Sequence, residues 1–168
     1  MSTIYEGQLR GAGLRVAIAA SRFNRVVTDG LVDGALDVLH QRGVDDDSIT
    51  IAWAPGAFEL PLIAQRLALS GDHDAVVCLG AVIKGGTDHY EHVAGQCAAG
   101  LTRVALDTAI PVVFGVLTTE TLEQALERSG ARSEGSADAA GSFDNKGAEA
   151  ADTAVEMADL MRQLPKPS

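Results

Sequence analysis

The sequence predicts an α/β protein, a three-layer α/β/α sandwich around a four-stranded parallel sheet. From Arg15 onward, short runs of β-forming residues alternate with longer stretches of helical periodicity. The β-forming runs are continuously apolar, which is typical of parallel strands covered by helices on both faces. Hydrophobic residues make up 46% of the chain but aromatics only 4%, so Ala, Val, Leu and Ile must fill the interior. The 168 residues fit one domain, 1–168, with a single core.

The first expected strand, RVAIAAS, leads into a helix over residues 27–42, and Gly43 is a typical residue to follow a helix C-terminus. The second strand, SITIAWA, precedes a helix over residues 59–69, and the third, DAVVCLG, precedes a helix over residues 90–108. Each strand is followed by a helix, as parallel pairing requires.

The fourth strand, PVVFGVL, precedes a helix over residues 119–129. Residues 129–147 are rich in Gly, Ser and Ala and lack periodicity, which predicts a long loop. The last helix, over residues 146–164, has an alanine-rich apolar face and an acidic stripe. Residues 1–14 are expected to form an extended N-terminal arm, and residues 165–168 a frayed tail.

Composition excludes several classes of partner. The net charge of −10 disfavours nucleic acid, because binding a phosphate backbone needs a cationic surface, although a small phosphorylated ligand stays possible. No run of about 18 apolar residues occurs, so we expect no membrane span and a cytoplasmic protein. Cys78 and Cys97 lack metal-binding spacing and are expected to be small core residues.

The segments that follow the strands carry the candidate chemistry, because open parallel sheets bind ligands at the carboxyl ends of their strands. These segments are SRFN, PGAFELP and KGGTDHYEH. Phe23 and Phe58 lie in the first two, so both are expected at the same sheet edge. Each alone favours core packing, but together they indicate a platform for a flat heterocycle.

Neither common phosphate motif is present. GAVIKGGT places its lysine before the glycines, unlike a Walker loop, and the early GAG lacks the third glycine of a dinucleotide fingerprint, so ATP and NAD are disfavoured. Gly85, Gly86 and Thr87 nevertheless stand before a helix, where free N–H groups can hold a phosphate. Arg128 and Lys146 flank the long loop and are either solvated charges or cations for such an anion.

Two residues near the helix starts have alternative readings. His89 is either an exposed residue at a helix start or a group that exchanges protons with a ligand near neutral pH. A metal site formed by His89 and His92 is disfavoured, because no third ligand has a recognised spacing. Glu59 suits a helix N-terminus in any case, and in a cleft it could accept hydrogen bonds from ligand hydroxyls.

Five segments in register make the sequence resemble the lumazine synthase family. They are SRFN, PGAFELP, GAVIKGGTDHYEHV, FGVLTTETLEQALERSG and NKGAEAA. The resemblance covers residues 5–163 and implies a flavodoxin-like fold and a condensation of 5-amino-6-(D-ribitylamino)uracil with 3,4-dihydroxy-2-butanone 4-phosphate. The product is 6,7-dimethyl-8-ribityllumazine, with release of phosphate and water, at the penultimate step of riboflavin synthesis. The family uses no cofactor and no metal.

The resemblance also implies roles for individual residues. His89 matches the catalytic histidine. The pyrimidine and ribityl chain would be held by Phe23, Ala57, Phe58, Glu59, Ala81, Val82, Ile83 and Phe114. The phosphate would be held by Gly86, Thr87 and Arg128, with Phe114 and Arg128 coming from a neighbouring subunit. Lys146 and Glu149 are supporting candidates, Glu149 either orienting His89 or simply solvated.

The sequence departs from the family pattern at two places. Lys84 stands where the family usually has arginine, so the charge is kept without the bidentate fork. The loop between Arg128 and Asn145 is longer than in shell-forming members, which predicts a homopentamer rather than a sixty-subunit shell.

Two other functions share parts of the pattern. A non-catalytic lumazine or flavin carrier would need Phe23 and Glu59 but not Thr87, His89 or Arg128, all of which the sequence keeps. A flavodoxin-like redox module would need a phosphate loop after the first strand, and SRFNRVV has neither its glycines nor its Ser/Thr cluster.

Overall fold

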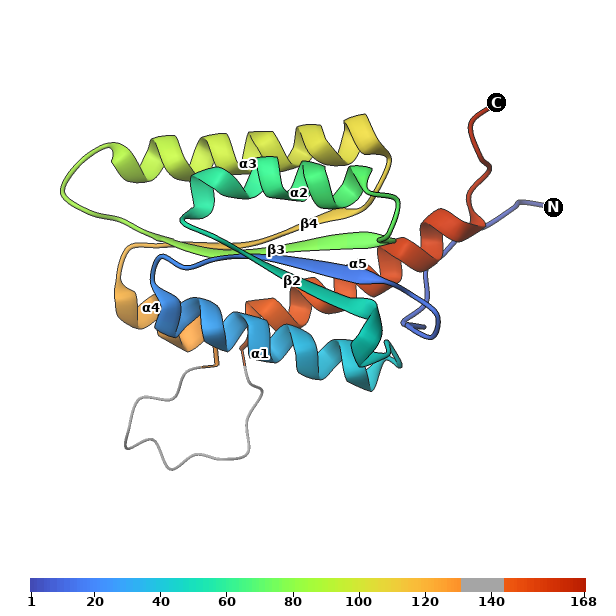
Figure 1. Ribbon diagram of the computed structural model, residues 1–168, viewed down its shortest axis with the longest axis horizontal. Coiled ribbons are helices and arrows are strands. Elements are labelled where there is room, and N and C mark those ends of the chain that lie inside the picture. The colour runs from blue at the N-terminus through green and yellow to red at the C-terminus, as the bar shows by residue number, and fades with distance from the viewer. Residues whose placement is uncertain (131–143) are drawn as a thin grey trace.

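The computed structural model of the chain describes residues 1–130 and 144–168, and it contains a four-stranded parallel sheet with the order β2-β1-β3-β4 (Figure 1). The strands are β1 Val16–Ser21, β2 Ile49–Ala54, β3 Ala75–Ile83 and β4 Val112–Thr119. This order confirms the predicted parallel α/β fold, with β1 and β3 in the centre.

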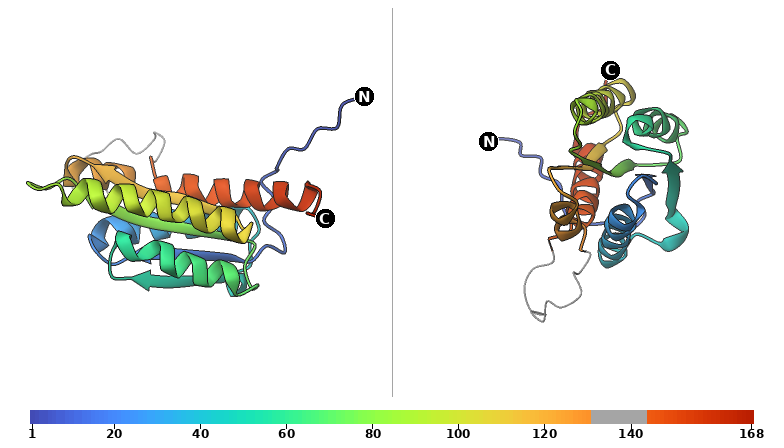
Figure 2. Two further views of the ribbon diagram at one scale, coloured as in Figure 1. Left: turned by 90° about the horizontal axis from the view of Figure 1, so that it is seen from above. Right: turned by 90° about the vertical axis from the view of Figure 1, so that its left-hand side faces the viewer.

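Helices cover both faces of the sheet and form a three-layer sandwich, as predicted (Figures 1 and 2). The layer above the sheet in Figure 1 contains α2 Leu60–Leu69 and α3 His89–Thr108. The layer below it contains α1 Arg25–Gln41, α4 Leu122–Arg128 and α5 Lys146–Gln163. Short 3-10 turns, Asp46–Ser48 and Ala57–Glu59, precede β2 and α2.

The two central strands separate the hydrophobic core into two halves. In β1, Ile18 and Ala20 face the α1–α5 half, whereas Ala17 and Ala19 face the α2–α3 half, and all four are fully buried. Burial on both faces explains the continuous apolar runs. The edge strands are more open, and Phe114 on β4 is 46% exposed, so that face of the sheet is not completely covered within one chain.

Element boundaries differ from the predicted ones by three residues at two sites and by at most two residues elsewhere. Strand β3 continues to Ile83 because its pairing with β4 extends to Ile83↔Thr119. Helix α4 starts at Leu122 rather than residue 119, because Thr121 forms a capping box with Gln124. The predicted loop 129–147 falls mostly on residues 131–143, which lie outside the described part of the chain.

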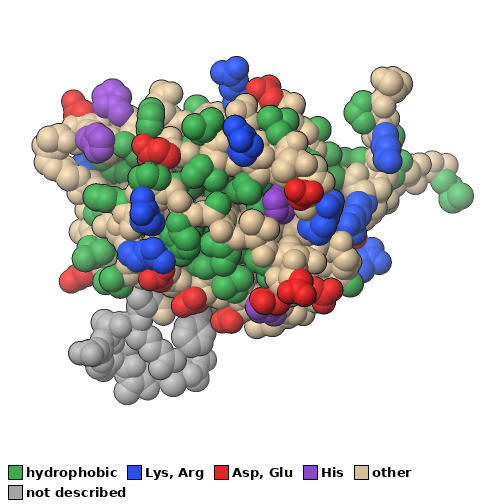
Figure 3. Space-filling model, viewed as in Figure 1, with side chains coloured by type: hydrophobic (Ala, Val, Ile, Leu, Met, Phe, Trp, Pro, Cys, Tyr) green, Lys and Arg blue, Asp and Glu red, His purple; other side chains and the backbone are tan. Residues whose placement is uncertain are grey.

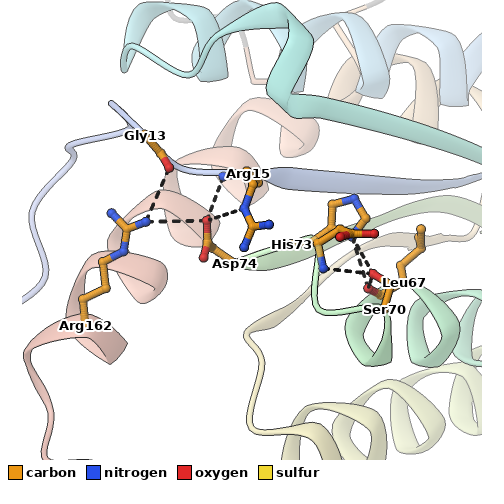
Figure 4. Close-up of polar contacts among 8 residues, drawn as sticks. Gly13, Arg15, Leu67, Ser70, His73, Asp74 and Arg162 are labelled. Carbon is orange, nitrogen blue, oxygen red and sulfur yellow. Dashed lines mark hydrogen bonds and ion pairs between the residues drawn. The ribbon is translucent and has the colours of Figure 1, made fainter.

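Segments near both chain ends contact the sandwich away from the carboxyl edge of the sheet. Residues 1–10 contain no helix or strand, and the Gln8 amide donates to Asp159 of α5 over 2.8 Å. Figure 4 shows Asp74, just before β3, between Arg15 and Arg162. The Asp74 carboxylate accepts a hydrogen bond from the Arg15 amide (2.8 Å) and lies 3.6 Å from the Arg162 guanidinium, which ties α5 to the start of the sheet.

Within the described residues, no helix combines the length and apolar character needed to cross a bilayer.

Helices α1 and α5 approach each other unusually closely. A Cβ at Gly147 would collide with the backbone carbonyl of Leu31, so only glycine fits there. At the other end of the contact, Arg42 pairs with Asp152 through two hydrogen bonds of 2.7 and 3.1 Å.

Replacing Gly147 with Ala should therefore destabilise the fold, by about 1–3 kcal/mol, because the added methyl overpacks a rigid backbone contact. The matched control is Gly95→Ala in α3, where a Cβ would meet nothing within 4 Å. That substitution should be neutral or stabilising by about 0.5–1 kcal/mol, since alanine is the better helix former. Chemical denaturation followed by circular dichroism measures both, and equal effects at the two sites would contradict the packing argument.

Candidate active site

The connections that leave β1, β2 and β3 meet around one cavity of about 640 Å³ at the carboxyl edge of the sheet. We call it the histidine cleft and define it by five of its lining residues, Phe23, Phe58, Glu59, Thr87 and His89. Figure 3 shows histidine side chains gathered at the end of the molecule where α3 begins.

The two phenylalanines of the histidine cleft are not core residues. Phe23 is 67% exposed and Phe58 is 58% exposed, whereas the apolar side chains of the central strands are almost completely buried. Exposed aromatic rings that line the same cavity favour the heterocycle platform over core packing.

The turn that carries Phe23 is fixed from two sides. Asn24 adopts a left-handed conformation (φ 59°), and its side-chain amide donates to the Ala81 carbonyl at 3.5 Å. Arg25 places its guanidinium 3.8 Å from the centroid of the Trp53 ring on β2. These contacts connect the β1–α1 turn to both neighbouring strands.

The end of β3 offers free backbone groups to the cleft. Pairing between β1 and β3 ends at Ala20↔Leu79, whereas β3 itself continues to Ile83. Ala81, Val82 and Ile83 line the cavity, and on the side toward β1 no ladder pair within the described residues engages them, although the Ala81 carbonyl accepts the long hydrogen bond from Asn24. Peptide groups in this position can recognise the polar edge of a ligand.

The turn between β3 and α3 carries the predicted phosphate residues. Gly85 and Thr87 line the cavity with His89, and Gly86 lies between them in the same turn. The Thr87 hydroxyl accepts a weak hydrogen bond from the His89 amide at 3.4 Å. The side chain of Lys84 is exposed, while its amide donates to the Thr119 carbonyl at 2.9 Å and joins this turn to the end of β4.

The remaining predicted site residues line a different cavity, also of about 640 Å³, beside β4 and α5. We call it the cationic cleft and define it by Phe114, Arg128, Lys146 and Glu149. Lys146 contacts Glu149 at 3.0 Å and Asp144 at 3.3 Å. Hydrogen bonds to these carboxylates, first Glu149 and then Asp144, raise the pKa of Lys146, so its ammonium stays charged.

A single chain therefore brings the histidine together with all pyrimidine and ribityl candidates except Phe114, and keeps them apart from Phe114 and the cationic candidates. Glu149, a candidate to orient His89, contacts Lys146 in the other cleft. Sequence reasoning did not include Tyr90, His92 and Val93 among the site residues, although they also line the histidine cleft. The helical spacing of His89, His92 and Val93 was the signal available for the last two.

The two cysteines are buried core residues whose thiols are held in the protonated form. Cys78 and Cys97 are buried, and burial raises the pKa of Cys97 to about 11 and that of Cys78 further, which disfavours the reactive thiolate. Within residues 1–130 and 144–168, no three His, Cys, Asp or Glu side chains gather as a potential metal site.

Comparison with known proteins finds similar chains that cover nearly all of this sequence. The family described as 6,7-dimethyl-8-ribityllumazine synthase matches residues 13–162. The chain is 52% identical over 165 residues to a 6,7-dimethyl-8-ribityllumazine synthase of Edwardsiella ictaluri (strain 93-146), covering 98% of this chain and 99% of the relative. It is 49% identical over 160 residues to a protein of the same description from Protochlamydia amoebophila (strain UWE25), covering 95% and 87%.

Proposed function

The chain belongs to the 6,7-dimethyl-8-ribityllumazine synthase family, and from this premise we propose that each active site joins the histidine cleft of one chain to the cationic cleft of a neighbouring chain. Its activity is that of a transferase in riboflavin biosynthesis. The proposed substrates are 5-amino-6-(D-ribitylamino)uracil and 3,4-dihydroxy-2-butanone 4-phosphate. The observation that carries the residue assignments is the placement of Phe23, Glu59 and His89 around one cavity at the carboxyl edge of the sheet.

The histidine cleft is proposed to bind the pyrimidine and its ribityl chain. Phe23 provides an exposed ring for stacking, and Ala57 and Phe58 form the adjoining wall. The Glu59 carboxylate accepts hydrogen bonds from ribityl hydroxyls. The backbone of Ala81, Val82 and Ile83 reads the polar edge of the ring, with Phe114 added by a neighbouring subunit.

The phosphate of the second substrate is proposed to lie between the turn before α3 and the cations of a neighbouring cationic cleft. Gly86 and Thr87 supply an amide and a hydroxyl near the start of α3. Arg128 supplies the main positive charge, and Lys146 a second one. A phosphate bound there places the reacting carbonyl of the butanone close to the pyrimidine amine.

His89 is the proposed proton carrier. The amine of the pyrimidine attacks the ketone, water leaves to give an imine, phosphate is then eliminated, and the ring closes with loss of a second water. Each of these steps moves a proton, and an imidazole can accept and return protons near neutral pH. Glu149 from the neighbouring subunit is proposed to orient His89. Holding both reactants together supplies a large part of the rate, which is why no cofactor is required.

The shared site requires an oligomer. We propose a homopentamer rather than a sixty-subunit shell, supported by the long segment between Arg128 and Asn145, whose central residues 131–143 lie outside the described part. The exposed Phe114 on β4 also fits a surface that a second copy covers. The ligands are small molecules rather than nucleic acid or membrane, and the proposed location is the cytoplasm.

His89→Ala should reduce turnover by about 10-fold to 10⁴-fold and leave residual activity, because proximity still operates without the proton carrier. His40→Ala is the matched control, since His40 is half exposed, pairs with Asp46 and lies near the C-terminus of α1. Formation of the fluorescent lumazine from the two substrates, without added metal or nucleotide, measures both variants. Unchanged turnover of His89→Ala would refute its role, and a wild-type protein that binds lumazine without accelerating its formation would be a carrier.

Mixed oligomers test whether the site is shared. His89→Ala chains keep the cationic cleft and Arg128→Ala chains keep the histidine cleft, so a site between unlike chains can be intact. Co-expressed chains with two different tags, purified over both, should regain about a quarter of wild-type activity per site, because random heterologous pairing makes about one site in four complete. Activity equal to the mean of the two parent variants would contradict a shared site.

Light scattering at neutral pH should give a mass of about five subunits if the proposed homopentamer is the closed ring that heterologous contacts can form. A mass near sixty subunits would refute the pentamer and leave the shared site standing.

A further inference from the structure

Asn145 uses every hydrogen-bonding group of its side chain. Its Oδ1 accepts from the Gly147 and Ala148 amides at 2.9 and 3.1 Å and caps α5. Its Nδ2 donates to the Gly30 carbonyl on α1 at 3.0 Å and to the Ser129 carbonyl after α4 at 3.1 Å. An amide offers two donors and two acceptor lone pairs, so this side chain is fully engaged.

The surface of α1 is shaped to receive these groups. A Cβ at Gly34 would collide with the Asn145 side chain, and one at Gly30 would collide with the Ser129 carbonyl. The two glycines lie one turn apart on the same face of α1 and together form a notch. Glycine in a helix interior destabilises the helix by about 0.5–1 kcal/mol relative to alanine. The contacts that the notch admits, from Asn145 and Ser129, compensate for this loss of stability.

We call the two Nδ2 hydrogen bonds of Asn145, to the carbonyls of Gly30 and Ser129, the Asn145 clamp. The residues next to this clamp in the sequence are the two cations of the cationic cleft. Arg128 immediately precedes Ser129, and Lys146 immediately follows Asn145, while Ser129 and Asn145 also form an isolated antiparallel bridge. We propose that Asn145 is a positioning residue that fixes the spacing of Arg128 and Lys146 for the substrate phosphate. This role rests on the function proposed above and adds to it a residue that touches neither substrate.

An N-terminal cap alone does not account for these contacts. Capping uses only Oδ1, and serine or threonine caps a helix about as well as asparagine. The two Nδ2 hydrogen bonds reach instead to α1 and to the end of α4, which the cap of α5 does not require. Anions bind more tightly to cations held in place beforehand, because less ordering is left to the moment of binding. The side chain therefore caps α5 with Oδ1 and joins α1 to the end of α4 with Nδ2. Because different atoms make these contacts, a substitution can remove one set and keep the other.

Asn145→Ser keeps a capping oxygen but is too short to reach the carbonyls of Gly30 and Ser129, and it adds no charge. We expect it to raise KM for 3,4-dihydroxy-2-butanone 4-phosphate about tenfold, with kcat and the pyrimidine KM within about twofold, since loss of preorganised binding acts on one substrate. The dissociation constant of inorganic phosphate, measured by calorimetry, should rise in parallel. Asn145→Thr, a second neutral cap, should behave alike.

Arg42→Gln is the matched control. Arg42 also joins α1 to α5, through Asp152, but it does so at the far end of the helices and contacts neither cation. It should leave both KM values and the phosphate affinity unchanged.

Three results would overturn the inference: an unchanged phosphate KM in Asn145→Ser, an equal rise in both KM values, or the same selective rise in Arg42→Gln. A wild-type protein that forms no lumazine would instead refute the proposed function. In that case the calorimetric titration with inorganic phosphate still tests whether Asn145 positions the two cations, because it needs no turnover.

Discussion

The close contact of α1 with α5 is the constraint on which both clefts depend. Gly147 rests against the Leu31 carbonyl with no room for a side chain, and Arg42 holds Asp152 at the other end. Helix α1 begins immediately after the turn that carries Phe23, and α5 begins at Lys146. One rigid pair of helices therefore separates the aromatic wall of the histidine cleft from the cations of the cationic cleft. A larger residue at Gly147, where the two backbones touch, would move the two relative to each other.

The unequal lengths of the central strands create the recognition surface of the histidine cleft. Strand β3 continues past the last residue paired with β1, and Asn24 turns the chain away from the sheet in a left-handed conformation. Residues 81–83 are then paired with β4 on one side, while on the other side they line the cleft and only the Ala81 carbonyl is engaged, by Asn24 at 3.5 Å. A strand that is half paired is both rigid and available to a ligand, which suits specific recognition of a flat ring.

Much of this architecture could be predicted from the sequence because each signal was local. Continuous apolar runs identified the strands, and the sheet rule placed Phe23, Phe58 and His89 at one edge. Boundaries failed where a side chain decided them, as at Thr121, whose capping box starts α4 later than the periodicity suggested. The clamp of Asn145 could be foreseen only as a helix cap, because its partner carbonyls are distant in sequence and backbone atoms leave no sequence signature. The separation of the two clefts came from the family resemblance, since no local pattern indicates which subunit supplies a residue.

The positions of the clefts also constrain how subunits can be arranged. The histidine cleft is built from the connections of β1, β2 and β3, whereas the cationic cleft lies along β4, α4 and α5. A site formed from these two different surfaces joins unlike patches of two copies, so the contact is heterologous. Repetition of a heterologous contact either closes into a ring or continues as an open filament. In a ring every histidine cleft meets a cationic cleft and none is left incomplete, and this is the physical reason to favour a cyclic assembly for the proposed shared site.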